Sequence, residues 1–139
     1  MSLIRLVYAS ESRLVDTCRS EELDRILASA RRLNERNGIT GFLLATDSAF
    51  AQVLEGAREA VAETYGRIGA DPRHAGLKLL CEQPIAARSF PGWAMGISER
   101  DETTTFIFGL YGVTPEEDLQ VQPLDVLLDL AGELAGPPA

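Results

Sequence analysis

Two polar side chains of this sequence stand where alternation along a strand predicts the core. Tyr8 shares a face with apolar residues in the segment LIRLVYA, and Gln52 does the same in AFAQVLE. A buried phenol and a buried amide both need hydrogen-bond partners, and an unpaired amide costs roughly 1–3 kcal/mol. A phenol can lose an electron and pass its proton along a hydrogen bond, and an amide can donate at one end and accept at the other. If their strands are neighbours, the two side chains meet, either in an ordinary core hydrogen bond or at a functional site.

A second group of candidate residues lies at the ends of two predicted helices. Asn34 ends the first helix close to its buried side, a place that an ordinary helix-terminal Asn also occupies. The end of the second helix carries a cluster of four polar residues, Arg67, Asp71, Arg73 and His74. The cluster is either a solvated helix end, where Arg and His are favoured by the helix dipole, or a site for phosphates. A lone His without a nucleophile and a base is weak support for catalysis, and neither dinucleotide-binding fingerprint is present.

The segments that carry these residues follow the order β-α-β-β-α-β-β. That order predicts an α+β fold, the ferredoxin-like split βαβ plan with an extra strand, in which one sheet has two helices on one face. The first and third strands are neighbours in this plan, so Tyr8 and Gln52 are expected to meet on the helix-covered face. Trp93 and Met95 share a face of the last predicted strand, and the simplest interpretation is that they are core residues. We expect strands at 3–9, 39–45, 49–55, 77–82 and 93–98, and helices from Ser20, as N-cap, to the Asn37-Gly38 stop and from about Arg58 to Ala70.

Beyond the last predicted strand the pattern weakens, and short helices are expected. The segment TPEE at 114–117 has the residue types of a helix start, with Pro at the first helical position and a capping-box Glu. Apolar residues from Leu124 to Leu134 recur at helical spacing. These helices are expected to cover the bare face of the sheet or to bind a partner. The predicted division is a domain at 1–98 and a helical appendage at 99–139.

Charge and composition exclude several classes of function. The chain has 139 residues, apolar and charged fractions ordinary for one globular domain, and a formal net charge of −8. Nucleic acid and anionic membrane partners are disfavoured, since both attract basic faces. No apolar run could span a bilayer and the start does not resemble a signal peptide, so we expect a cytoplasmic protein with Cys18 and Cys81 reduced. One His and two scattered Cys cannot form a typical zinc site, so no metal is expected.

Five stretches of the chain form an ordered series of motifs. They are RLVYAS at 5–10, N-x-x-x-G-I-T-G at 34–41, F-x-Q-x-L-E-G at 50–56, Y-x-R-I-x-x-D-x-R-H at 65–74 and R-x-F-x-x-W-x-M at 88–95. Together they resemble the BLUF family, the sensors of blue light using FAD. The stretches occur in the family's order and cover about the first 98 residues. Each stretch alone is only a modest match to the family, whereas the combination of all five is highly specific.

The resemblance implies that FAD lies between the two helices with its ring directed toward the sheet. It makes Tyr8 the photoactive tyrosine, places Gln52 between Tyr8 and the flavin, and makes Asn34 a hydrogen-bond partner of the polar edge of the flavin. Arg67 and Asp71 are expected on the ribityl-phosphate side, with Arg67 as the anion partner. The choice of FAD over FMN follows from the resemblance alone.

The resemblance also assigns roles farther from the ring. His74 matches a recurrent His near the flavin, and Trp93 and Met95 match the strand residues that relay the signal. Two positions depart from the family. Leu33 stands where His or a second Asn is common, and Ala30 stands where Ser is common. Both departures remove polar contacts, so we expect them to change the affinity for FAD and the dark recovery rate rather than the existence of the binding site.

A photoreceptor, and not an enzyme, is what the resemblance implies. In the family picture, light drives an electron and a proton from Tyr8, the pair recombines, and Gln52 is left rearranged. A new hydrogen bond to the flavin C4 carbonyl then shifts the absorption slightly to the red, and the rearranged Gln52 repacks Met95 and Trp93. With no fused output domain expected, the signal is expected to pass in trans to a downstream protein that the sequence does not identify, or through a homodimer.

Two other functions remain open from the sequence. A light-inert ferredoxin-like module that binds a small molecule or a protein would purify without yellow colour. A flavin oxidoreductase would need a path for substrate to the flavin and turnover with a reductant, and no set of substrate-positioning residues is evident.

Overall fold

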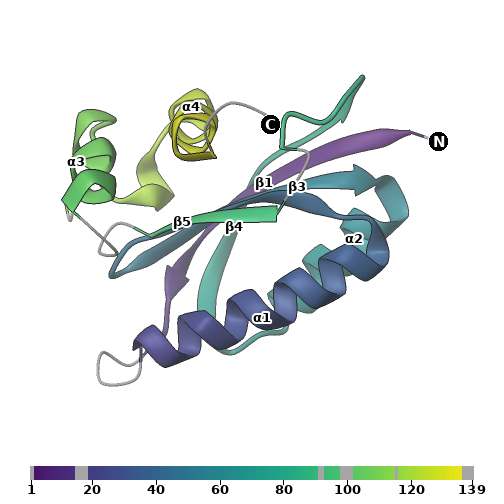
Figure 1. The fold of residues 1–139 in the computed structure, drawn as a ribbon, viewed down its shortest axis with the longest axis horizontal. Helices are drawn as coiled ribbons and strands as arrows, with labels where there is room; N and C mark the ends of the chain where they lie inside the picture. The colour runs from purple at the N-terminus through teal and green to yellow at the C-terminus, as the bar shows by residue number, and fades with distance from the viewer. Residues whose placement is uncertain (1, 15–18, 91–92, 98–101, 115, 136–139) are drawn as a thin grey trace.

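A five-stranded sheet forms the centre of the computed structural model, which describes residues 2–14, 19–90, 93–97, 102–114 and 116–135. Its strands are β1 (Leu3–Ser12), β2 (Thr40–Ala45), β3 (Ala49–Ala57), β4 (His74–Ile85) and β5 (Trp93–Ile97). They lie in the order β4-β1-β3-β2-β5 (Figure 1). The first four strands pair antiparallel, and β5 is added parallel to β2 at the edge. The predicted ferredoxin-like plan with an extra strand is therefore confirmed.

Helices cover both faces of this sheet. The helices α1 (Arg19–Asn37) and α2 (Arg58–Gly69) lie on one face, as predicted (Figure 1). The helices α3 (Glu102–Leu110) and α4 (Leu124–Ala135) lie on the other, with the short 3-10 turn η2 (Leu119–Val121) before α4. The sheet is thus the middle of three layers.

Alternating residues of β1 supply the two separate faces. Ile4, Leu6 and Tyr8 pack in a cluster on the side of α1 and α2, whereas Val7 and Ala9 pack in a cluster on the side of α4. This is the two-residue period of a pleated strand, in which neighbouring side chains point to opposite faces. The apolar side of α4 is buried in the second cluster, so α4 packs on the sheet.

Three strands are longer than the sequence predicted, and one of them, β3, runs two residues past its predicted end to Ala57. β1 continues past residue 9 to Ser12, because Ser10 and Glu11 pair with β3 and Ser12 pairs with His74 of β4. β4 in turn begins at His74 and ends at Ile85, beyond the predicted 77–82. The polar residues after Ala9 predicted a loop, but backbone pairing with two neighbouring strands outweighs that local preference.

The boundaries of α1 agree with the prediction at one end and differ at the other. The helix begins at Arg19, so Ser20, which was predicted as the N-cap, lies within the first turn instead. At its end, Gly38 has φ +71° and follows Asn37, as the Asn-Gly stop predicts. Only glycine adopts this left-handed conformation without a steric penalty, which is why the stop signal is reliable.

The C-terminal part differs most from the prediction. α3 was not predicted, because its three Thr and its Phe and Ile residues have low helix propensity, and burial of Phe108 in the core stabilises it instead. The predicted helix start at 114–117 is wrong. Thr114 Oγ1 accepts a hydrogen bond from the backbone N–H of Glu117 at 3.0 Å within a turn, and the chain goes on to η2. Pro115 lies outside the described residues.

Candidate cofactor-binding site

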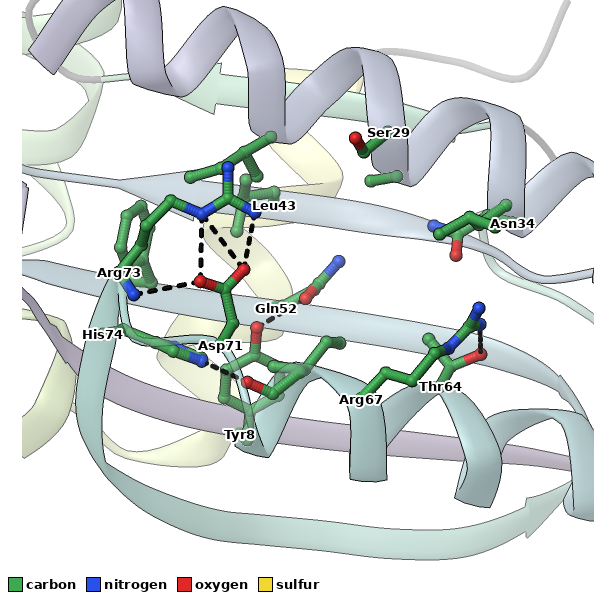
Figure 2. Close-up of a pocket in the computed structure, with 15 residues that line it drawn as sticks. Tyr8, Ser29, Asn34, Leu43, Gln52, Thr64, Arg67, Asp71, Arg73 and His74 are labelled. Carbon is green, nitrogen blue, oxygen red and sulfur yellow. Dashed lines mark hydrogen bonds and ion pairs between the residues drawn. The ribbon is translucent and has the colours of Figure 1, made fainter.

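A pocket of about 150 Å³ lies between α1 and α2, with the sheet as its floor (Figure 2). Apolar side chains of α1 and of the sheet form most of its wall, and polar groups point into it from all three sides. Its lining residues are Ile26, Ser29, Ala30, Leu33 and Asn34 of α1, Tyr8, Leu43, Phe50 and Gln52 of the sheet, and Thr64, Arg67, Ile68, Asp71, Arg73 and His74 of α2 and the segment after it.

Tyr8 and Gln52 meet at the floor of the pocket, as the sequence predicted. They lie opposite each other in the β1–β3 register, and the Tyr8 hydroxyl donates a hydrogen bond of 2.5 Å to Oε1 of Gln52 (Figure 2). Both side chains are buried, at 2% and 5% exposure. Burial raises the pKa of Tyr8 well above its usual range, and the nearby Tyr65 and Asp71 add to the rise. Tyr8 is therefore a neutral hydrogen-bond donor at physiological pH.

Two buried amides remain short of partners within the described part of the chain. Asn34 is 3% exposed, and its side-chain amide has no hydrogen-bond partner among the described residues. Only its backbone carbonyl oxygen is paired, with the backbone N–H of Ile39. Gln52 uses Oε1 for Tyr8, and its NH₂ group has no partner among the described residues. Buried polar groups are almost always hydrogen-bonded, so two unpaired amides facing one cavity indicate a ligand with donors and acceptors along its edge.

Asp71 and Arg73 form an ion pair at one end of the pocket. Nη2 of Arg73 lies 2.6 Å from Oδ2 of Asp71, and its Nε also donates to both carboxylate oxygens (Figure 2). These hydrogen bonds lower the pKa of Asp71 and raise that of Arg73. Nη1 of Arg73 further lies 3.9 Å from Glu22 of α1, so the pair links the two sides of the pocket.

Arg73 lines the pocket but was not among the residues predicted to contact the cofactor. The sequence placed it in the cluster with Asp71 and His74, but its position two residues after Asp71 did not show that its guanidinium would turn into the pocket. Ser29 was missed as well. It brings a hydroxyl into the α1 wall one residue before Ala30, the position where the family pattern led us to look for Ser.

His74 lines the pocket but uses both ring nitrogens inside the protein. Nε2 lies 2.6 Å from the carbonyl oxygen of Ile68, and Nδ1 lies 2.8 Å from Oγ of Ser10. Since a carbonyl can only accept, Nε2 donates its N–H to Ile68, and Nδ1 shares a hydrogen bond with the Ser10 hydroxyl. The ring also lies edge-on to Tyr8, with centroids 6.1 Å apart. His74 therefore fixes the end of α2 against β1 beside Tyr8.

Arg67 differs from Arg73 in its pairing. Arg67 is exposed at the rim of the pocket, and its Nη2 donates a weak hydrogen bond of 3.4 Å to Oγ1 of Thr64. No acidic side chain pairs with it within the described ranges. A cation at the mouth of a pocket without an acidic partner is available to an anionic group of a ligand.

The two predicted relay residues are placed by backbone register alone. The side chains of Trp93 and Met95 lie outside the described part of the structure. In the backbone, Met95 is in register with Leu43, and Leu43 is in register with Gln52. Met95 is thus two strands away from Gln52 along one row of the sheet.

The fold and the pocket define an α+β domain that binds a cofactor between two helices and against a Tyr–Gln pair. The family model described as "BLUF: Sensors of blue-light using FAD" matches residues 3–96. This chain therefore belongs to the BLUF family, whose members are sensors of blue light and use FAD.

Similar proteins agree with this assignment. The photo-activated state of BlsA has a TM-score of 0.80 and 32% identity, over 98% of this chain and 96% of that one. The dark state of the BLUF protein BlrB has a TM-score of 0.76 and 30% identity, over 96% and 97%. Photoactivated adenylate cyclase subunit beta of Euglena gracilis is 34% identical over 104 residues, which are 75% of this chain and 12% of that protein. The match covers only 12% of that cyclase subunit, so this comparison bears on the BLUF domain alone.

The pocket fits the flavin of FAD on its own features. A flavin is a flat ring system with carbonyl acceptors and an N–H donor on one edge. Such an edge suits the apolar walls, the Asn34 amide and the Gln52 NH₂ group, which have no partners among the described residues. In the described ranges no group of three or more His, Cys, Asp or Glu side chains could hold a metal ion. None of the helices described there has the length and hydropathy of a membrane span.

Proposed function

We propose that the Tyr8–Gln52 hydrogen bond is the light-sensitive element of this blue-light receptor. The observation that carries the proposal is the burial of this bond at the pocket floor, with the Gln52 NH₂ group left over for a ligand. When bound, FAD supplies blue-light absorption and an oxidising excited state. Tyr8 would give up an electron to the excited flavin and pass its proton along the hydrogen bond to Oε1 of Gln52, and both would return to Tyr8 when the pair recombines.

Gln52 can change the hydrogen-bond network while its backbone stays in place. Its amide accepts at one end and donates at the other, so rotation or a tautomer shift exchanges donors and acceptors toward the pocket. Because β1 and β3 hold Tyr8 and Gln52 opposite each other, the rearranged side chain remains within reach of Tyr8. The proposed signal is therefore a switch in side-chain hydrogen bonding that needs no change of fold.

The remaining pocket residues are proposed to hold the cofactor. Asn34 offers its amide to the polar edge of the flavin, and Arg67 offers an unpaired cation to the phosphate side. Asp71 is proposed to act at the same side through its pair with Arg73. His74 is proposed to make van der Waals contact with the flavin ring rather than a hydrogen bond, since both of its ring nitrogens are hydrogen-bonded within the protein.

We further propose that the signal leaves through β5 and the helices after it. Trp93 and Met95 remain the proposed relay residues, and the register that links Gln52, Leu43 and Met95 supports this route. The division into a sensor at 1–98 and an appendage at 99–139 likewise remains a prediction.

The proposed receiver is a downstream protein in the cytoplasm, with a homodimer as the alternative. α4 buries its apolar side against the sheet, whereas Phe106 and Leu110 of α3 are 66% and 67% exposed and lie one helical turn apart. An exposed apolar pair is a candidate contact for such a receiver. Size-exclusion chromatography in the dark and under blue light distinguishes the two, since only the homodimer changes the elution of the purified protein by itself.

The test of the proposed function is the absorption spectrum of the purified protein before and after blue light. The wild-type protein is expected to show a flavin spectrum with a small reversible red shift. Tyr8→Phe is expected to retain FAD and lose the shift, because the phenol that loses the electron and proton is gone. Tyr111→Phe, at a half-buried Tyr in the cluster on the other face, is the matched control and is expected to keep it.

Two outcomes would count against the proposal. A normal photocycle in Tyr8→Phe would show that another residue is the donor. A colourless protein that does not take up added FAD would favour the light-inert binding module.

A further inference from the structure

A second cluster of charged side chains lies on the sheet face opposite the pocket. Its centre is Glu55 of β3, whose side chain is fully buried. Oε2 of Glu55 accepts from Nε of Arg5 at 2.9 Å and lies 2.8 Å from Nη2 of the same side chain. The backbone N–H groups of Ser89 and Phe90 donate to the same carboxylate at 3.2 and 2.8 Å. Both carboxylate oxygens are thus paired, and they hold the loop between β4 and β5 against β3.

Arg88, in the same loop, contacts three other segments with one guanidinium. Nη1 donates to Oγ1 of Thr40 at 2.7 Å and to the carbonyl oxygen of Glu55 at 2.8 Å. Nη2 donates to the carbonyl oxygen of Gly38 at 2.9 Å. These acceptors belong to the start of β2, the end of β3 and the residue that follows α1.

Each of these segments also carries a residue of the pocket. Asn34 lies one turn before Gly38 on α1, Leu43 lies on β2 after Thr40, and Gln52 lies three residues before Glu55 on β3. The loop that carries Arg88 leads directly into β5. Arg88 therefore connects three walls of the cofactor pocket to the strand that is proposed to receive the signal.

A cavity of about 210 Å³ lies on the other side of the loop, lined by Arg5, Ser89 and Phe90 and by Leu128, Gly132 and Ala135 of α4. Since close packing transmits displacement and a void does not, α4 does not restrain the loop across this cavity. The loop is held by the hydrogen bonds of Arg88 and Glu55 and by the buried Phe90, which packs against Phe42.

We propose that Arg88 is a positioning residue that transmits the change at Gln52 to β5, an inference that rests on the proposed function of Tyr8 and Gln52. Its guanidinium makes the end of α1, the start of β2, the end of β3 and the loop move as one unit. Without this fork of donors, the photochemistry at Gln52 continues, but β5 responds less to it. The acceptors are spread over two nitrogens of a planar fork, a geometry that a lysine ammonium does not reproduce.

The only tryptophan of the chain makes this separation measurable. Trp93 begins β5, and its emission reports on the strand, whereas the flavin red shift reports on Gln52. In the wild-type holoprotein, blue light is expected to produce both the red shift and a change in Trp93 emission. In Arg88→Lys, which keeps the positive charge, the red shift is expected to remain and the change in Trp93 emission to fall about twofold or more.

Two further variants keep the test decisive. Arg58→Lys is the matched control, because Arg58 makes an exposed ion pair of 3.4 Å with Glu82 away from the cluster, and it is expected to respond like the wild type. Thr40→Val removes one of the three acceptors of Arg88 and is expected to reduce the change in Trp93 emission by less than Arg88→Lys does.

The outcomes separate this inference from the proposed function. A full Trp93 response in Arg88→Lys overturns the role of Arg88. A wild-type protein with a normal red shift and no change in Trp93 emission overturns it too and leaves the proposed photochemistry intact. Absence of the red shift in the wild type overturns both. If Arg88→Lys does not retain FAD, a full response in Thr40→Val overturns the role of Arg88.

Discussion

The two faces of the sheet differ in how completely their buried polar groups are paired. On the side of α4, one continuous apolar cluster joins the strands to the helices, and the buried Glu55 has donors on both carboxylate oxygens. On the side of α1 and α2, the core is divided into two separate clusters, and the pocket lies at the division. The Asn34 amide and the NH₂ group of Gln52 face that pocket without partners among the described residues.

Within one sheet, the α4 face thus serves stability and the pocket face serves ligand binding. A face whose buried polar groups are paired gains free energy from that pairing and from burial, whereas a face prepared for a ligand keeps polar groups unpaired until the ligand arrives. We infer that the α4 face supplies most of the stability of the empty protein and that the pocket face gains its own share when the cofactor binds. Four predictions test this comparison.

The largest expected effect is on the α4 face. Leu130→Ala is expected to lower the free energy of unfolding by about 3 kcal/mol, because Leu130 is fully buried and its truncation leaves a cavity. The red shift should be unchanged below the melting temperature. Urea unfolding and the light-minus-dark spectrum measure the two quantities. Leu110→Ala, at an exposed Leu of α3, is the control, and an equal loss of stability in both variants would contradict the comparison.

Removal of FAD is expected to have the next largest effect. The cofactor would fill the gap between the two clusters of the pocket face and pair the buried amides. It should therefore stabilise the folded state by about 2.7 kcal/mol when free FAD is at 100 times its dissociation constant. Thermal unfolding of the apoprotein at increasing FAD concentrations measures this. A melting temperature independent of FAD would show that the pocket face is already closed without the cofactor.

Asn34→Ala should separate binding from stability on the pocket face. The variant is expected to weaken FAD binding about five- to tenfold, the worth of one hydrogen bond. The stability of the apoprotein should not fall, since the amide loses no partner among the residues that the structure describes and Ala favours the helix. Titration with FAD and urea unfolding measure the pair of effects. Asn37→Ala, on the same helix but not lining the pocket, is the control for affinity. Loss of apoprotein stability in Asn34→Ala would mean that the amide is already paired.

The smallest effect is expected from acid. The pKa of Asp71 is lowered in the folded protein, chiefly by its hydrogen bond to Arg73, so the unfolded chain binds a proton more readily. Its stabilising contribution is thus present above the ordinary pKa of an Asp, about 4, and is lost as the pH falls through the lowered folded value. Because the pair is partly exposed, we expect less than about 1 kcal/mol. The stability gap between wild type and Asp71→Asn should shrink from pH 7 to pH 3, and a constant gap would contradict this.

Much of this protein follows from local sequence signals. Two-residue alternation in β1 and β3 put Tyr8 and Gln52 on the helix-covered face, and the Asn37-Gly38 stop ended α1 at the observed residue. The order of the elements predicted the sheet, and the motif series predicted the family that the comparisons confirm. Each of these signals is short in range, because periodicity and turn chemistry depend on neighbouring residues.

Contacts between distant segments decided the rest. Ser10 to Ser12 join β1 through pairing with β3 and β4, and α3 forms from poor helix formers because Phe108 is buried. Arg73 enters the pocket through its pair with Asp71, and Arg88 finds acceptors 33 to 50 residues away in the chain. No local pattern encodes such partners. Their free energy comes from desolvation and hydrogen bonding between segments that only the folded chain brings together.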